Sequence, residues 1–455
     1  MGVADIMISK LRSLYEKSPQ HVRSFFNILP QYIEFSHVFR RTARQLQEYD
    51  EYNSEFALSL QRKKLSSLLY YSIKNVPFYQ DIASKWLDSQ HIINEPFEVL
   101  RDFPILSKEN LINDGDKFIS RVCPKSKRYT ATTGGSTGRP ISIQISDSMW
   151  SSEWAYVYNL LREFGVTPSH RRVSFRGTSN LDLSTSRPFQ ENPVYKELRV
   201  SPFFLSENNT HDILTKWYSF NPTFVHGYPS AIKDFIGLLS EDECEKIFHN
   251  IRVILLVSEN IQYKEMRQIE KITKTPVTSF YGHTERACFA PWKREQKLWV
   301  PEWSYGVSEL RNNKLVVTGF HNLAMPLIRY DTDDAVSCSL FSDGTLSPFS
   351  GFESIMGRWS SDFLIGAGGQ KITMTALNVH SEIMNKVGKY QLVQNKLGEA
   401  ELRIVIRDEV NRNSIAKKVY EEFQNKCGES LKLNYKIVSE IPLTSIGKHR
   451  FLVRE

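Results

Sequence analysis

The amino-acid sequence predicts an α/β fold, with a large N-terminal body of several subdomains and a small α+β domain at its C-terminal end. Three observations support this prediction. The chain has 455 residues, more than one hydrophobic core commonly holds. In its middle, short apolar runs typical of buried strands alternate with helical stretches, as they do around a largely parallel sheet. After about residue 360 the pattern changes to a hairpin followed by helices and strands.

The elements of the body follow from the spacing of its apolar residues. Near-helical spacing from about residue 48 to residue 79 predicts a helix that Pro77 ends. The expected buried strands cover residues 172–175, 223–226, 253–257 and 277–280, and the expected helices cover 212–218 and 230–239.

The C-terminal part has its own pattern. Residues 363–365 and 371–373 flank a glycine-rich turn, which predicts a hairpin. The elements expected after it are a helix at 374–384, a strand at 401–407, a helix at 413–426 and a strand at 434–438. We therefore divide the chain into a body of residues 1–360 and a C-terminal domain of residues 361–455.

Charge and composition exclude some classes of protein. The net charge is +7, from 58 basic and 51 acidic residues, which fits either an anionic ligand such as a nucleotide or a merely basic surface. The basic residues are spread without interleaved aromatics, so we expect no nucleic-acid partner. The five cysteines are scattered and form no C-x-x-C pair, which argues against a zinc site or a disulfide framework.

Membrane association is not expected either. The longest apolar runs, such as residues 253–257, suit a buried strand and are too short to cross a bilayer. The first residues include Asp5 and lack the apolar core of a signal peptide, which predicts a cytoplasmic protein.

A loop of small and hydroxyl-bearing residues lies between two strand-like stretches. Glycines leave backbone N–H groups accessible and hydroxyls add donors, so such a loop can surround phosphate oxygens. It lacks the Lys-Ser/Thr pair of a Walker loop, and a flexible surface hairpin is the alternative interpretation. The candidate residues are Thr133, Gly134, Gly135, Ser136, Thr137 and Gly138.

A second candidate segment begins at an expected strand end. Tyr281 followed by Gly282 can present an aromatic ring to a purine, and Glu285 can hold Mg²⁺ near phosphates. Taken alone, Tyr281 fits a core aromatic equally well, and Glu285 fits a charge at a helix start.

Three further segments carry charged candidates. A strand-like run from residue 325 to residue 330 leads into an acidic segment with Asp331, Asp333 and Asp334, which suits ribose or metal binding but also a solvated turn. Arg358 lies near the expected domain boundary, and Lys448 lies in a glycine-flanked segment close to the end of the sequence. Each of these, taken alone, also fits a surface charge.

The order of the five segments is more specific than any one of them. From Thr130 to Arg450 they resemble, in sequence, the motifs of the adenylate-forming superfamily of acyl-CoA synthetases and adenylation domains. Within it the chain is most similar to the phenylacetate–CoA ligase branch, including relatives in capsular polysaccharide biosynthesis loci. Residues 76–79, 103–108 and 322–330 carry this closer likeness.

The resemblance implies a fold and an activity. The fold is that of the adenylate-forming enzymes, in which the small C-terminal domain is mobile. The activity is ATP-dependent conversion of a carboxylic acid to acyl-AMP and pyrophosphate, followed by transfer to an acceptor, in the first place the CoA thiol. ATP, Mg²⁺ and CoA are thus the expected cofactors, a small-molecule carboxylic acid is the expected substrate, and a homodimer is expected because relatives are often dimers.

The resemblance also implies roles for single residues. Ser136, Thr137 and Gly138 would hold the β- and γ-phosphates. Tyr281 would stack on adenine and Asp334 would accept from the ribose hydroxyls. The full set of expected nucleotide-binding residues is Thr133, Gly134, Gly135, Ser136, Thr137, Gly138, Tyr281, Gly282, Asp334 and Arg358.

The expected catalytic residues are Lys448 and Thr284, with Glu285 as the Mg²⁺ ligand and Asp362 as the hinge. Thr284 would contact the α-phosphate. Lys448 would bridge that phosphate and the acid, where a cation about 4 Å away contributes roughly 4 kcal/mol at an effective dielectric constant near 20. Rotation at Asp362 would then remove the lysine and admit the acceptor.

The acid pocket is expected from His226, Tyr228, Ser258, Glu259 and His283. These are more polar than a plain aryl acid requires, so a polar acid such as a sugar-linked or amino acid is expected. For His226, a hydrogen-bonded core histidine is an equal alternative.

Two features leave the activity open. An acceptor amine or carrier protein in polysaccharide biosynthesis is an alternative to CoA, because the acceptor leaves no decisive mark on the sequence. Asp333 stands where the family usually has glycine, which keeps a non-catalytic nucleotide-binding scaffold as an alternative, although Glu285 and Lys448 argue against it.

Overall fold

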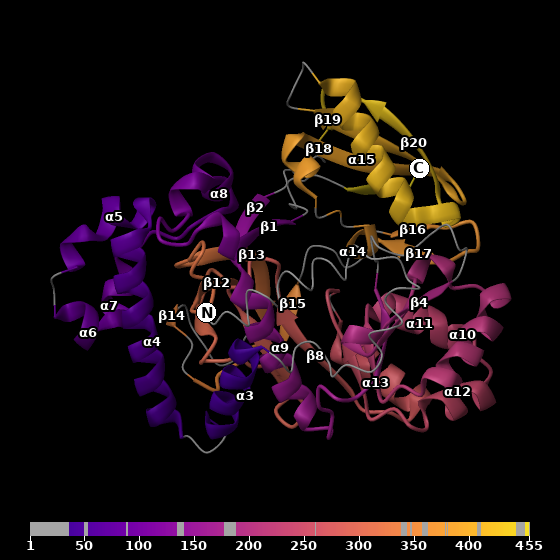
Figure 1. The fold of residues 1–455 in the computed structure, drawn as a ribbon, viewed down its shortest axis with the longest axis horizontal. Helices are drawn as coiled ribbons and strands as arrows, with labels where there is room; N and C mark the ends of the chain where they lie inside the picture. The colour runs from indigo at the N-terminus through magenta and orange to yellow at the C-terminus, as the bar shows by residue number, and fades with distance from the viewer. Residues whose placement is uncertain are drawn as a thin grey trace.

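The computed structural model describes residues 36–49, 53–87, 90–133, 141–176, 188–259, 261–337, 344–345, 348–356, 363–377, 379, 381–406, 411–442 and 451–454. In this part of the chain an α/β body carries a smaller unit, drawn in yellow, above one of its ends (Figure 1). No helix of the described residues has the length and apolar character needed to cross a membrane.

The body is built around an eight-stranded sheet with the order β10-β9-β8-β7-β6-β3-β5-β4. The five strands from β8 to β5 pair in parallel, and the outer strands are antiparallel. Because β3, β6 and β7 are buried along their whole length, both faces of the sheet must be covered. The strands are β3 (Arg172–Phe175), β4 (Phe189–Asn192), β5 (Glu197–Val200), β6 (Phe224–Gly227), β7 (Val253–Leu256), β8 (Val277–Gly282), β9 (Phe289–Lys293) and β10 (Leu298–Trp299).

Helices cover the two faces of this sheet. On one face Trp154 of α9 (Asp147–Arg162) contacts His226, and on the other face Trp217 of α10 (Glu207–Phe220) and Phe235 of α11 (Pro229–Gly237) pack on Phe175. The chain continues through α12 (Glu241–Phe248) and α13 (Tyr263–Thr273). The predicted strands and helices of this region are thus confirmed, with boundaries shifted by a few residues.

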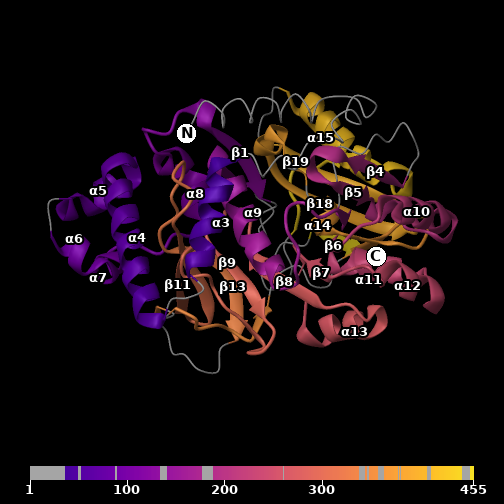
Figure 2. The same cartoon turned by 60° about the horizontal axis from the view of Figure 1, so that its bottom comes forward.

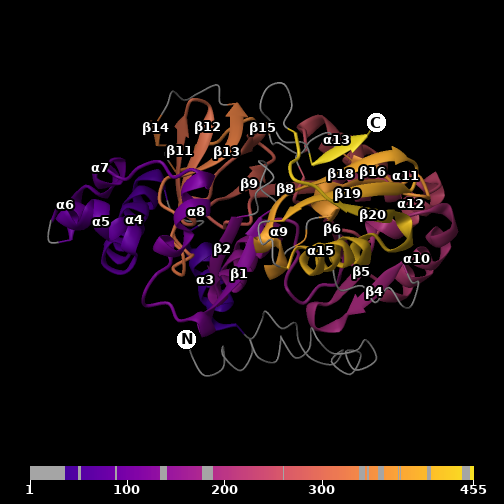
Figure 3. The same ribbon diagram turned by 90° about the horizontal axis from the view of Figure 1, so that it is seen from above.

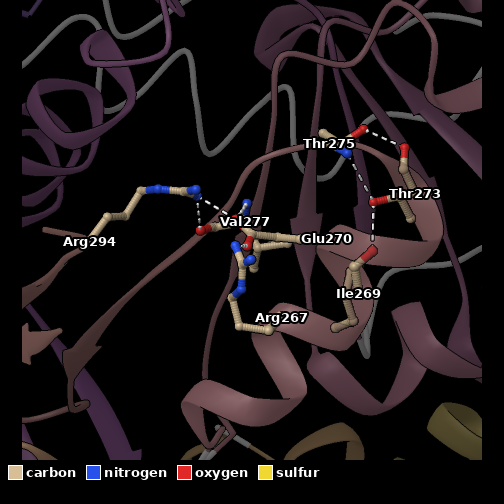
Figure 4. A network of polar contacts seen from close by, with 7 residues as sticks. All are labelled: Arg267, Ile269, Glu270, Thr273, Thr275, Val277 and Arg294. Carbon is tan, nitrogen blue, oxygen red and sulfur yellow. Dashed lines mark hydrogen bonds and ion pairs between the residues drawn. The ribbon is translucent and has the colours of Figure 1, made fainter.

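A network of charged side chains fixes the beginning of β8 (Figure 4). The Val277 N–H donates to the Glu270 carboxylate at 3.0 Å, and Arg294 donates to the Val277 carbonyl at 3.0 Å. Arg294 and Arg267 both pair with Glu270. This network lies at the opposite end of β8 from Tyr281.

A second, antiparallel sheet has the order β14-β11-β12-β13-β15 and lies beside the first one (Figures 2 and 3). Its strands are β11 (Gly306–Arg311), β12 (Lys314–Gly319), β13 (Tyr330–Ser337), β14 (Gly344–Thr345) and β15 (Ser354–Met356). The strand expected over residues 325–330 is wrong, because β13 begins at Tyr330 and itself contains the acidic segment. Pro326 lacks a backbone donor and Arg329 has a φ of 53°, so neither can continue a strand ladder.

The helices between residues 54 and 101 lie at the end of the molecule away from the yellow unit (Figures 1 and 3), whereas the helix of residues 37–49 lies against α9. The predicted helix is confirmed as α4 (Ser54–Asn75), which Asn53 caps, and Pro77 begins the next helix instead of ending the first. The helices are α3 (His37–Tyr49), α4, α5 (Pro77–Ala83), α6 (His91–Asn94), α7 (Pro96–Arg101) and α8 (Lys108–Asp114). After them, β1 (Arg128–Thr133) and β2 (Ile141–Ser146) form a hairpin on either side of residues 134–140.

The C-terminal unit contains a four-stranded sheet with the order β20-β19-β18-β21, covered by α15 (Arg412–Cys427). The expected hairpin is confirmed as β16 (Phe363–Ile365) and β17 (Lys371–Thr373). The helix expected at 374–384 is wrong, because α14 (Met374–Leu377) is short and Glu382–Lys386 is a 3₁₀ turn; the weak helix formers Asn, Val, His and Ser stand between them. The strands are β18 (Val387–Lys396), which was not predicted, β19 (Glu399–Ile406), β20 (Lys432–Ile437) and β21 (Leu452–Arg454).

Three hydrogen bonds hold the C-terminal hairpin on the body. The Gln370 side-chain amide donates to the Phe203 carbonyl at 2.7 Å, and the Thr373 hydroxyl donates to Glu259 at 2.8 Å. The Lys371 backbone N–H donates to the Asp234 carboxylate on α11. The hairpin thus rests on the turn after β7 and on α11.

We expect Thr373→Val to loosen this contact while leaving the body folded. The substitution removes the hydrogen bond to Glu259, worth about 1 kcal/mol, and a longer one from the Ala376 N–H, so the hairpin should open at least about fivefold more often. Hydrogen exchange of residues 363–377 measures this opening. Thr345→Val, at an exposed position of β14, is the matched control. Equal exchange of the hairpin in both variants would contradict the docking role of Thr373.

Candidate active site

Three neighbouring parallel strands bring most of the described candidate residues to one edge of the main sheet. His226 lies near the end of β6, Ser258 and Glu259 follow β7, and Tyr281 lies near the end of β8. Because β6, β7 and β8 are adjacent and parallel, their carboxyl ends lie together. Crevices at such carboxyl ends are the usual ligand-binding places of open α/β sheets.

A hydrogen bond joins the two sheets at this edge. The Tyr281 hydroxyl on β8 donates to the Asp334 carboxylate on β13 at 2.8 Å. The Tyr281 ring also packs edge-on against Phe352, with centroids 6.2 Å apart. The expected adenine-stacking and ribose-binding residues, separated by more than fifty residues in sequence, are therefore in direct contact.

Glu285 lies in a tight turn directly after β8. The Arg286 N–H donates to the His283 carbonyl at 3.0 Å and closes this turn. One oxygen of Glu285 accepts from the Tyr330 hydroxyl at 2.9 Å, and the other lies 3.2 Å from His283 Nδ1. The carboxylate is thus buried yet held from two sides.

These contacts decide the charge of Glu285. Burial alone would raise the pKa of its carboxyl group, but the hydrogen bond from His283 and the positive charges of His283 and Lys108 lower the pKa to about 2. Glu285 is therefore ionised at every physiological pH. Burial raises the pKa of Asp334, against the opposing effects of Tyr281, His283 and Lys108.

Lys108 and Tyr330 are site residues that were not among the predicted ones. Lys108 is the first residue of α8, which Ser107 caps, and its charge acts on both Glu285 and Asp334. Both residues belong to segments that carry the resemblance described above, residues 103–108 and 322–330. That likeness was the available signal for them.

Asp333, the departure from the family glycine, has a φ of 60°. Its backbone N–H donates to Asp331 at 2.7 Å, and its own carboxylate pairs with Lys314 at 2.6 Å. Aspartate tolerates this left-handed conformation better than most residues. Asp333 therefore occupies the glycine position with a salt bridge to a half-exposed lysine on the neighbouring strand.

His226 lies near the carboxyl end of β6, and Tyr228 directly follows this strand. His226 is 4% exposed, and its Nδ1 atom has no hydrogen-bond partner in the described structure. Burial lowers the pKa of its imidazole well below the usual value, and the charges of Arg176 and Arg172 lower it further. A neutral imidazole with a free buried nitrogen can still receive or donate one hydrogen bond.

Backbone packing restricts this part of the edge. At Gly227 a Cβ atom would lie 2.5 Å from the Phe175 carbonyl oxygen, so β6 and β3 approach each other more closely than any other residue allows. Tyr228 follows Gly227 directly, and the centroid of its ring lies 5.8 Å from the Arg176 Cζ atom.

The Glu259 carboxylate already has hydrogen-bond partners within the protein. Its carboxylate accepts from the Ser230 N–H at 2.9 Å, from the Ser230 hydroxyl at 2.8 Å and from Thr373. Ser258, which precedes it, has a φ of 67°. Glu259 thus caps α11 and holds the C-terminal hairpin, and its assignment to the acid pocket stays a prediction together with those of His226, Tyr228, Ser258 and His283.

Several predicted residues cannot be placed. Thr133 ends β1, which leads into the expected phosphate loop. Gly134, Gly135, Ser136, Thr137, Gly138, Arg358, Asp362 and Lys448 lie outside the described residues, as does the predicted domain boundary. Thr284 and Gly282 are described and lie in the same segment as Glu285.

The site fits a magnesium ion that is bound mainly by phosphates. Among the described residues, no three His, Cys, Asp or Glu side chains are grouped as a metal site. Mg²⁺ at nucleotide sites keeps several waters and commonly takes only one or two protein carboxylates beside the phosphates. The ionised Glu285 carboxylate has the chemistry of such a ligand, and its assignment to Mg²⁺ stays a prediction.

Known sequences resemble both parts of the chain. The CapK C-terminal domain family matches residues 364–455. Protein CapK of Staphylococcus aureus is 25% identical over 411 residues, which cover 87% of this chain and 88% of that protein. The likeness therefore extends through the body as well as the C-terminal unit.

Solved structures of similar fold are 2-hydroxyisobutyryl-CoA ligases. One, in complex with 2-HIB-AMP and CoA in the thioesterification state, has a TM-score of 0.52 and 15% identity, covering 89% of this chain and 91% of that one. An open conformation of the same ligase has a TM-score of 0.49 and 14% identity, covering 87% and 91%. At this identity the first comparison supports the fold, which is that of the adenylate-forming ligases.

The chain is thus similar to the CapK C-terminal domain family over residues 364–455 and to CapK along most of its length, and its fold is that of the adenylate-forming ligases.

Proposed function

We propose that this protein adenylates a carboxylic acid with ATP and then transfers the acyl group to an acceptor, in the first place the CoA thiol. The observation that carries the proposal is the junction of the two sheets, where Tyr281, Asp334 and the ionised Glu285 lie together beside the carboxyl ends of β6 and β7. The 2-hydroxyisobutyryl-CoA ligase of similar fold, solved with 2-HIB-AMP and CoA, supports the same chemistry.

In the first step, a carboxylate oxygen of the acid attacks the α-phosphorus of ATP. The bond from that phosphorus to the bridging oxygen breaks, and pyrophosphate leaves. Asp334 would accept from the ribose hydroxyls, and Tyr281, already hydrogen-bonded to Asp334, would carry the adenine on its ring. Glu285 would ligate the Mg²⁺ that neutralises the phosphates.

In the second step, the acceptor attacks the acyl carbon and AMP leaves. With CoA the thiol loses its proton and a thioester forms. A sugar amine or a carrier protein would react at the same carbon, and the likeness to CapK together with the polar residues His226 and Glu259 keeps this acceptor class as the alternative.

Acid-dependent exchange of labelled pyrophosphate into ATP tests the first step. The screen covers aryl, aliphatic, hydroxy, sugar and amino acids, and we expect exchange with one polar class. AMP release with CoA, a sugar amine or a carrier protein then identifies the acceptor. No exchange with any acid, in a protein that binds ATP, would favour the non-catalytic scaffold or an acid borne on a polymer.

Lys448→Ala should lower the exchange rate about 100- to 1,000-fold while the protein stays folded. The reason is the loss of the cation that joins the two anions in the adenylation step. Circular dichroism and thermal unfolding serve as the folding control. A folded variant with normal acyl-AMP formation would remove Lys448 from the mechanism.

Glu285→Gln should lower exchange about 100-fold and raise the Mg²⁺ concentration needed for half-maximal rate. The same variant tests the low pKa of Glu285 through stability. A carboxyl group whose pKa falls from 4.5 to about 2 on folding stabilises the protein above pH 4.5, and this contribution is lost as the pH falls towards 2. Wild type should therefore exceed Glu285→Gln in unfolding free energy at pH 6, and the difference should shrink in acid. A difference that grows in acid would contradict the assigned pKa.

A further inference from the structure

The turn that contains Glu285 ends in a strained backbone conformation at Arg286. Arg286 has a φ of 57°, a left-handed conformation that costs a residue with a Cβ atom roughly 1–2 kcal/mol. Strain of this kind persists where the surroundings fix it, and it is common at functional sites. Contacts of Arg286 must therefore stabilise its backbone conformation, since a glycine would adopt it without strain.

An ion pair holds the Arg286 side chain. Its guanidinium pairs with the Glu153 carboxylate on α9, and both side chains are mostly buried. The second oxygen of Glu153 accepts from the fully buried Tyr305 hydroxyl at 3.2 Å. Each oxygen of the carboxylate thus has its own partner, so Glu153 provides a fixed anchor for Arg286.

The next residue is fixed by close backbone packing. Ala287 is 2% exposed and lies against two glycines of the second sheet. A Cβ atom at Gly319 would be 2.7 Å from the Ala287 Cα, and one at Gly306 would be 3.2 Å from its carbonyl oxygen. The chain cannot move here without displacing β11 or β12.

Glu285 lies between these anchors and the end of β8. Its backbone is enclosed by the His283–Arg286 hydrogen bond, and its side chain meets Tyr330 and His283 only if the turn keeps this shape. The residue after Glu153 on α9, Trp154, contacts His226 edge-on at 5.9 Å. One helix therefore contacts both the carboxylate turn and the candidate acid pocket.

We propose that Arg286 and Glu153 are positioning residues, whose ion pair fixes the left-handed turn that directs the Glu285 carboxylate into the nucleotide site. The proposal rests on the function proposed above for Glu285, and it adds two residues that touch neither nucleotide nor acid. It also explains why an arginine occupies a glycine-like backbone position.

Two variants separate the ion pair from the backbone strain. Arg286→Met removes the charge and keeps the strained backbone, whereas Arg286→Gly removes the side chain and adopts the left-handed turn freely. We expect both to lower the exchange rate about 10- to 100-fold, and to raise the Mg²⁺ concentration for half-maximal rate, with the KM for the acid changed less than about twofold. Arg286→Lys should recover part of the loss. Glu153→Gln combined with Arg286→Met should be no worse than either change alone.

The matched control is the ion pair at the other end of β8. Arg294→Met breaks the contacts with Glu270 and Val277 (Figure 4). Val277 begins β8, whereas Glu285 follows the other end of that strand. Arg294→Met should lower stability to a similar degree but leave the Mg²⁺ dependence unchanged. A similar change of Mg²⁺ dependence in Arg294→Met would reduce the Arg286 effect to general stability and overturn the proposal.

A stability cycle tests the inference without catalysis. In denaturant unfolding at pH 6, Glu285→Gln should shift the midpoint in wild type but much less in Arg286→Met, because the carboxylate has then already lost its fixed partners. Additive shifts would overturn the positioning role. Absence of exchange in the wild type, with this coupling present, would count against adenylation of a free acid and leave the positioning role intact.

Discussion

The parallel pairing of β6, β7 and β8 is the constraint on which the site depends. Parallel register places the three carboxyl ends at one edge, so residues separated by more than fifty positions become neighbours without any long loop. The second sheet then meets this edge through the Tyr281–Asp334 hydrogen bond. Since both faces of the main sheet are covered by helices, this edge is the natural place for a ligand.

The sequence was sufficient for the parts of the fold that local patterns determine. The buried parallel strand β7 is a continuous apolar run, and the buried residues of α4 follow helical spacing. The helix at 374–384 was overextended across the weak helix formers at residues 378–381. The strand β18 was missed because its state depends on tertiary pairing with β19 and β21. The acidic strand β13 was misplaced for the same reason: its aspartates are paired by neighbours from β8 and β12.

Candidate site residues could be named from the sequence where they lie in one contiguous motif. They could not be named where the fold brings them together from distant elements. Tyr281, His283 and Glu285 are close in sequence and share one turn. Lys108, Tyr330 and Glu153 come from other elements, and nothing in their local sequence points to Glu285. Glu259, whose place in the acid pocket stays a prediction, has a structural role that the sequence did not indicate. Its oxygens accept hydrogen bonds from Ser230 of α11 and from Thr373 of the C-terminal hairpin, so this one side chain connects the turn after β7 with the smaller unit.

The close approach at Gly227 has a consequence for how the substrate choice of this protein can be changed. Because Phe175 leaves no room for a Cβ atom, the backbone of β6 cannot be displaced sideways without separating it from β3. Under the proposed function, a change in the acid that this chain accepts would then come from exchanging side chains such as His226 and Tyr228 on an unchanged backbone. Attempts to redesign the selectivity of this chain should therefore leave Gly227 in place.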